Sequence, residues 1–110
     1  MAESIEHLLN APASGAEAPT LARLEEALTS GYAQALALEA ERLRLERRIS
    51  EVARQVDGGD FSAYAEELRS LGRRLTSADG EIEALRVQLG ALRQRARETR
   101  RAVPAGQRLQ

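Results

Sequence analysis

The sequence predicts an all-α fold in which two long helices form an antiparallel hairpin. Three observations predict it: apolar residues recur at alternating spacings of three and four in both halves, a short glycine-rich segment separates the halves, and Ala, Leu, Glu and Arg dominate the composition. This composition is typical of coiled coils and long helices. Because the connecting segment is short, the two helices are expected to run antiparallel.

The first long helix is expected over residues 20–56. Thr20 is a candidate N-cap, and Pro19 is an alternative residue for the first turn. The seam of a and d positions is apolar except at Gly31 and Arg42. It consists of Leu21, Leu24, Leu28, Gly31, Ala35, Leu38, Arg42, Leu45, Ile49, Val52 and Val56. The helix is expected to end at the turn Asp57-Gly58-Gly59-Asp60, because glycine readily adopts the left-handed conformation that closes a helix.

The second long helix is expected over residues 60–103, with Asp60 as its N-cap and residues 104–110 as a tail. Its seam consists of Phe61, Tyr64, Leu68, Leu71, Leu75, Ala78, Ile82, Leu85, Leu89, Leu92, Ala96, Thr99 and Val103. A strict 3.5-residue apolar period predicts left-handed supercoiling of the two helices.

Two alignments of the helices satisfy the apolar pattern. The first sets Ile49 against Tyr64 and brings opposite charges together, as Arg48 with Glu67 and Glu41 with Arg74. The second slides the helices by one heptad, which brings like charges together but sets the small Gly31 against the large Leu89. Surface ion pairs contribute only tenths of a kcal/mol, so charge favours the first alignment only weakly.

Residues 1–19 are predicted to hold a short apolar motif and a flexible linker. Ile5, Leu8 and Leu9 lie at helical spacing, and the linker over residues 11–19 is rich in Ala, Pro, Gly and Ser. The motif suits a linear motif that places an amphipathic turn in a partner's groove. It suits equally a segment that folds back onto its own bundle, and the sequence leaves both alternatives open.

A second apolar stripe runs beside the seam of the first long helix. It comprises Tyr32, Ala33, Leu36, Ala37, Ala40 and Leu43. A two-helix hairpin covers one stripe per helix, and contiguous exposed apolar surface usually marks an interface. We therefore expect this face to bind a partner, which is either a second copy in a homodimeric four-helix bundle or a client protein.

The C-terminal region is basic. Residues 93–110 contain Arg93, Arg95, Arg97, Arg100, Arg101 and Arg108 against Glu98 alone. Such a run is a candidate contact for nucleic acid or another anion, but it lacks the interleaved aromatic residues that single-strand binders use. Cations also stabilise a helix C-terminus, and we favour this structural interpretation. Arg42, at a seam position, is expected to extend its guanidinium outward to Glu39, Glu46 or Asp79.

No catalytic constellation is visible in the sequence. The chain has no Cys, its one histidine is His7, and its glycines lack the spacing of a phosphate-binding loop. We expect no enzyme activity, no cofactor and no metal. No apolar run is long enough to span a membrane and the N-terminus lacks the features of a signal peptide, so we expect a cytoplasmic location.

These patterns predict a non-enzymatic coiled-coil interaction module: an adaptor, scaffold or chaperone-like subunit. The alternative is a nucleic-acid-associated coiled coil that uses the C-terminal Arg run. All sixteen basic residues are Arg, which is typical of a GC-rich genome and indicates a bacterial source.

Overall fold

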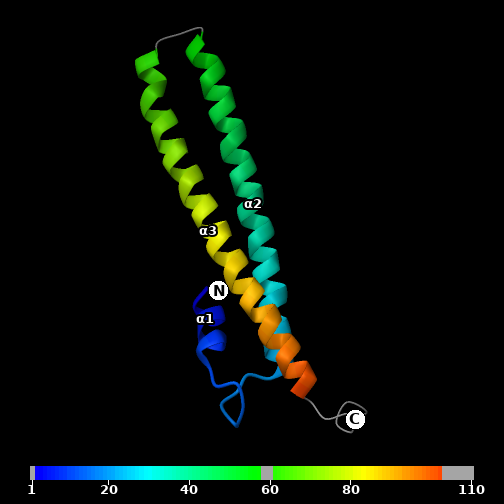
Figure 1. Cartoon of the computed structure of the whole chain (residues 1–110). Helices are drawn as coiled ribbons and strands as arrows, with labels where there is room; N and C mark the ends of the chain where they lie inside the picture. Colours follow the sequence, from blue (N-terminus) through cyan, green and yellow to red (C-terminus); the bar gives the residue numbers. More distant parts are fainter. Residues whose placement is uncertain (1, 58–60, 103–110) are drawn as a thin grey trace. The chain divides into compact units, whose positions relative to one another are not determined.

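The computed structural model describes residues 2–57 and 61–102, with side chains over residues 5–56 and 61–102. Within these ranges the chain is almost entirely helical: α1 spans Ala2–Asn10, α2 spans Leu21–Asp57 and α3 spans Phe61–Ala102 (Figure 1). The prediction of an all-α chain with two long helices in contact is confirmed. Of the predicted turn, residues 58–60 lie outside the described residues, as do Val103, Arg108 and the predicted tail over 104–110.

Thr20 caps the start of α2. Its side-chain oxygen accepts a hydrogen bond from the backbone N–H of Arg23 at 3.2 Å, and its carbonyl accepts one from the N–H of Leu24 at 3.1 Å. The first bond satisfies one of the N–H groups that a helix start leaves without intrahelical partners, and the second is the first i→i+4 bond of the helix. The helix therefore begins at Leu21, directly after the predicted cap.

The contacts of the chain divide it into two units. Unit 1 comprises the described residues of Met1–Gln34 and Leu85–Gln110, and unit 2 comprises Ala35–Ala84. Both long helices contribute to each unit, whereas α1 belongs to unit 1 alone. The two units differ in how their apolar residues are covered, so each is described separately.

Unit 2 is a two-helix seam. Leu45 and Val52 of α2 and Leu71 and Ala78 of α3 are buried and form its core. Residues packed against this core are only partly buried: Ile49, Tyr64, Leu68 and Leu75. All eight occupy predicted seam positions, so the alternating three-and-four spacing identifies the face on which α2 and α3 meet.

Two ion pairs of unit 2 connect its helices and show that they run antiparallel. Arg48 contacts Glu67 at 2.6 Å, and Arg74 contacts Glu41 at 3.2 Å. Both are the pairs expected from the first alignment. Hydrogen bonding to the Glu67 carboxylate, reinforced by its charge, raises the pKa of Arg48. The pairs lie on the surface and add little to stability.

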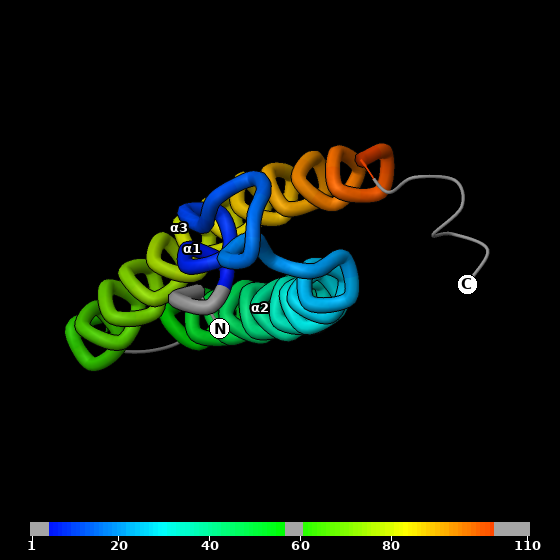
Figure 2. Tube along the Cα trace, turned by 90° about the horizontal axis from the view of Figure 1, so that it is seen from below, coloured from blue at the N-terminus to red at the C-terminus, as the bar shows by residue number. Residues whose placement is uncertain are grey.

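Unit 1 is built from three helical segments. α1 lies against both α2 and α3, and Figure 2 shows it between them. Fully or nearly fully buried apolar residues come from all three: Ile5, Leu8, Leu24, Leu85, Leu89, Leu92 and Ala96. The apolar side of α1 thus closes a groove that two helices alone leave open.

Gly31 permits a close approach of α2 and α3 in unit 1. A Cβ atom at this position would lie 2.5 Å from Leu89 Cδ2 and 3.6 Å from Ile5 Cδ1. Any side chain here would therefore displace Leu89. The second alignment predicted this juxtaposition, while the first predicted the ion pairs of unit 2. Features of both alignments occur because each seam residue packs into a hole formed by four residues of the facing helix rather than against a single residue.

Candidate functional site

The predicted second stripe is exposed on α2. Leu36 is 68% exposed, Leu43 48% and Tyr32 42%. Ala33 and Ala37 are exposed as well, and Ala40 is half-buried. Leu36, Ala37, Ala40 and Leu43 belong to unit 2, while Tyr32 and Ala33 belong to unit 1. Leu36 is the most exposed large apolar side chain among the described residues.

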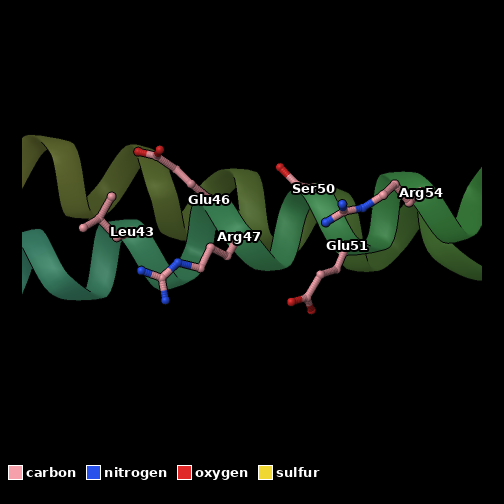
Figure 3. Close-up of a pocket in the computed structure, with 6 residues that line it drawn as sticks. All are labelled: Leu43, Glu46, Arg47, Ser50, Glu51 and Arg54. Atoms are coloured by element: carbon pink, nitrogen blue, oxygen red, sulfur yellow. The ribbon is translucent and has the colours of Figure 1, made fainter.

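Leu43 also borders a concavity of about 520 Å³ on α2. The other lining residues are Glu46, Arg47, Ser50, Glu51 and Arg54 (Figure 3). All six lie on one helix, so the hollow is a gap between long side chains rather than a cleft between elements. It adds polar and charged groups to the end of the apolar stripe, as expected for the rim of a protein interface.

Arg42 occupies its seam position as a partly buried cation. Its guanidinium lies 3.5 Å from Glu46 and 3.6 Å from Asp79. These are two of the three carboxylates expected from the sequence. The Nε atom of Arg42 is buried and makes no hydrogen bond. The same Nε atom lies 3.5 Å from the Glu46 carboxylate, so it has an ion-pair partner although it makes no hydrogen bond. Polar residues at seam positions often specify helix pairing at a cost in stability.

The N-terminal apolar motif is folded onto unit 1. Ile5 is 0% exposed and Leu8 4%, whereas Leu9 is half-buried. The sequence left two alternatives open, and in the structure the motif folds back onto the chain's own helices. Glu6, His7 and Asn10 on the other side of α1 are exposed.

Arg95 holds the end of α1 in place. Its guanidinium donates hydrogen bonds to the backbone carbonyls of Leu9 at 2.9 Å, of Pro12 at 2.6 Å and of Ala11. The last carbonyls of a helix have no intrahelical donors and carry partial negative charge. Arg95, on α3, satisfies this need at Leu9 and also donates to the carbonyls of the two residues that follow α1. The sequence showed the cation but not this role, because backbone carbonyls leave no mark in a residue pattern.

The remaining residues of the Arg run lie in unit 1 in different settings. Arg100 contacts Glu25 of α2 at 2.9 Å. Arg97 donates a hydrogen bond to Gln94 at 2.9 Å. Arg93, Arg97 and Arg101 are exposed. Of the five described arginines of the run, Arg95 and Arg100 thus contact other segments of unit 1.

The described part of the chain holds no group of three or more His, Asp or Glu residues that could bind a metal ion. Among the described helices, none is both long and apolar enough to cross a membrane. Among the described residues, the candidate site with the most exposed apolar surface is the stripe on α2, named here the α2 stripe.

Comparison of the chain with protein-family models, with curated proteins and with solved structures finds no match.

Proposed function

We propose that this chain is a non-enzymatic, cytoplasmic coiled-coil interaction module that forms a homodimeric four-helix bundle through the α2 stripe. As an adaptor, scaffold or chaperone-like subunit, it would act by presenting its surfaces to other proteins. One observation carries the proposal: Leu36 and Leu43, one heptad apart, are 68% and 48% exposed.

Burial of this stripe would supply the energy for association. Fully burying a leucine side chain is worth roughly 1.5–3 kcal/mol. Ala37 and Ala40 lie between the two leucines, and such small residues let a second helix approach closely. A heptad repeat on one helix is also the pattern that pairs with a copy of itself.

A second copy is the favoured partner because cyclic dimers are the commonest oligomers and use the same surface on both subunits. The half-buried seam residues of unit 2 support this choice, since a second hairpin would cover them further. A client protein is the alternative occupant of the stripe.

Association with nucleic acid through the Arg run has less support. Arg95 donates its hydrogen bonds to backbone carbonyls and Arg100 contacts Glu25. Using either for phosphate would cost those contacts. Arg95 and Arg100 therefore support the packing of unit 1.

The test is sedimentation velocity on the double variant Leu36→Glu, Leu43→Glu. We expect the natural chain to sediment as a dimer and the variant as a monomer, because four glutamates would have to be buried in one interface. The matched control is Val87→Glu, Ala91→Glu, which adds the same charge at exposed apolar positions of α3. This control should remain dimeric.

Leu85→Glu serves as a second control, because Leu85 is 4% exposed and a charge there should unfold its helices. Circular dichroism should show that the Leu36/Leu43 variant keeps most of its helicity while Leu85→Glu does not. A monomeric natural chain, or an unchanged mass in the Leu36/Leu43 variant, would contradict the proposed dimer. If that variant keeps its mass but loses a partner protein captured by the natural chain, the stripe binds a client instead.

A further inference from the structure

The groove of unit 1 beneath α1 has the properties of a peptide-binding site. Leu89 forms part of its floor, and Gly31 leaves the space that Ile5 approaches. The side chains of Ile5 and Leu8 on α1 enter the groove and are almost fully buried. Figure 2 shows α1 between α2 and α3. The groove therefore accepts a helix through two apolar side chains three residues apart.

Recognition of α1 depends on few of its side chains. Glu6, His7 and Asn10 are exposed. The polar contacts come from Arg95, which donates to the carbonyls of Leu9, Ala11 and Pro12. Carbonyls are common to all sequences, so Arg95 recognises the backbone of the last turn of a helix and of the two residues that follow it rather than a particular side chain. Any short helix with a suitable apolar pair and a free C-terminal end meets the same requirements.

The hold on α1 is modest. α1 has 9 residues, and isolated helices of this length are marginal in water. Only Ile5 and Leu8 of its described side chains are classed as buried. Residues 11–20 connect it to α2, and they include Gly15 at φ 94°, a conformation that favours glycine. Because the connection is short, it holds α1 near the groove at an effective concentration on the order of millimolar.

We propose that this groove is a recognition site for a short amphipathic helix of another protein, and that α1 is a displaceable occupant that closes it. The partner helix carries aliphatic residues at positions i and i+3 and ends shortly afterwards, so that its last carbonyls reach Arg95. The site uses residues of unit 1 that are distinct from Leu36 and Leu43. The proposal therefore stands independently of dimerisation through the α2 stripe.

The test uses the full chain with Ile5→Asp and Leu8→Asp, which removes α1 from the groove. The probe is a fluorescein-labelled peptide of residues 2–13, and fluorescence anisotropy measures its binding. We expect saturable binding of the peptide to this variant. Binding to the natural chain should be weaker by about tenfold or more, because tethered α1 competes for the groove. Adding Arg95→Gln to the variant should weaken binding about tenfold, the size expected for loss of charge-assisted hydrogen bonds.

A peptide that carries the same two Asp substitutions is the matched control and should not bind. Absence of saturable binding to a variant that keeps its helicity would overturn the proposal, as would equal binding to the variant and the natural chain. If the two Asp substitutions prevent folding, a protease site inserted between Ala13 and Ser14 allows the linker to be cut after folding. The labelled peptide should then exchange into the cut chain and not into the uncut one.

Sedimentation velocity distinguishes a second copy as the occupant. If the natural chain is a dimer and Ile5→Asp, Leu8→Asp alone makes it a monomer, α1 is exchanged between copies. That result would overturn the proposal of a foreign helix. This result is distinguishable from failure of the proposed dimerisation through the α2 stripe, because that failure is measured with the variant Leu36→Glu, Leu43→Glu.

Discussion

Unit 1 buries its seam more completely than unit 2 does. Ile5, Leu24 and Leu92 of unit 1 are 0% exposed, whereas Val52 is the one large side chain of unit 2 buried to that degree among the described residues. The seam patterns of the two units are equally regular. The difference lies in the third segment: α1 covers unit 1, and no other part of the described chain covers unit 2. Two helices bury only part of their shared seam in unit 2, whereas the third helical segment of unit 1 increases the number of fully buried side chains there.

The largest expected effect tests this difference in the interiors. Leu92→Ala in unit 1 should cost about 2–5 kcal/mol of unfolding free energy, because it empties a fully buried site. Leu75→Ala in unit 2 should cost clearly less, because that side chain is only partly buried. Urea unfolding of both variants measures the costs. Equal costs would break the comparison and would mean that another molecule covers unit 2 in solution.

A smaller effect sharpens the comparison at two glycines. Gly31→Leu should destabilise unit 1 by about 1–3 kcal/mol, because overpacking displaces Leu89. Gly80→Ala in unit 2 should stabilise by up to about 1 kcal/mol, because nothing lies within 4 Å of its position and alanine favours helix. Thermal unfolding monitored by circular dichroism shows whether each variant is stabilised or destabilised. A stabilising Gly31→Leu would show that the approach of α2 and α3 at Leu89 is not tight.

The smallest expected effect concerns the surface charge of unit 2. A hydrogen bond from Arg69, then its charge and that of Arg73, lower the pKa of Glu66 below its ordinary value of 4.5. A carboxyl group whose pKa is lowered by folding stabilises the fold at pH values above its ordinary pKa. This contribution is lost as the pH falls through the lowered pKa of the folded chain. Glu66→Gln should therefore lower the urea midpoint slightly at neutral pH and not at strongly acidic pH.

Arg69→Gln provides the control for this pH effect. In that background the pH-dependent change in urea midpoint caused by Glu66→Gln should shrink, because the largest cause of the lowered pKa is gone. A change that persists undiminished would mean that Arg69 is not the main source of the shift. Glu66 is fully exposed, so solvent keeps the whole effect small.

The sequence predicted most of the long helices and little of the site in unit 1. The expected ranges 20–56 and 60–103 compare with Leu21–Asp57 and Phe61–Ala102. The seam spacing, the Thr20 cap and the charge pairs are local or periodic signals, and these can be read from residue order. The four-helix assembly stays a prediction, as does the role of the α2 stripe.

The packing of α1 could not be chosen from sequence, for two physical reasons. Ile5 and Leu8 satisfy a foreign groove as well as their own, because burial of two apolar residues is not directional. The bonds that decide the matter run from Arg95 to backbone carbonyls, which every residue possesses. Gly31 was visible as an exception in the seam, and the second alignment set it against Leu89. The sequence favoured the other alignment weakly, so only the structure showed that the two residues meet.

The contacts of the two units also differ in the length of chain that each must close. Arg48 and Glu67 are 19 residues apart and Arg74 and Glu41 are 33 apart, whereas Arg100 and Glu25 are 75 apart and Arg95 and Leu9 are 86 apart. Loop-closure entropy rises with chain length, so contacts between distant residues form late. We expect unit 2 to assemble first during refolding and α1 to dock last. Pulse-labelled hydrogen exchange would contradict this order if the amides of α1 gained protection before those around Glu41 and Arg74. On this order, every newly made chain passes through a stage in which its helix-binding groove is complete and still empty.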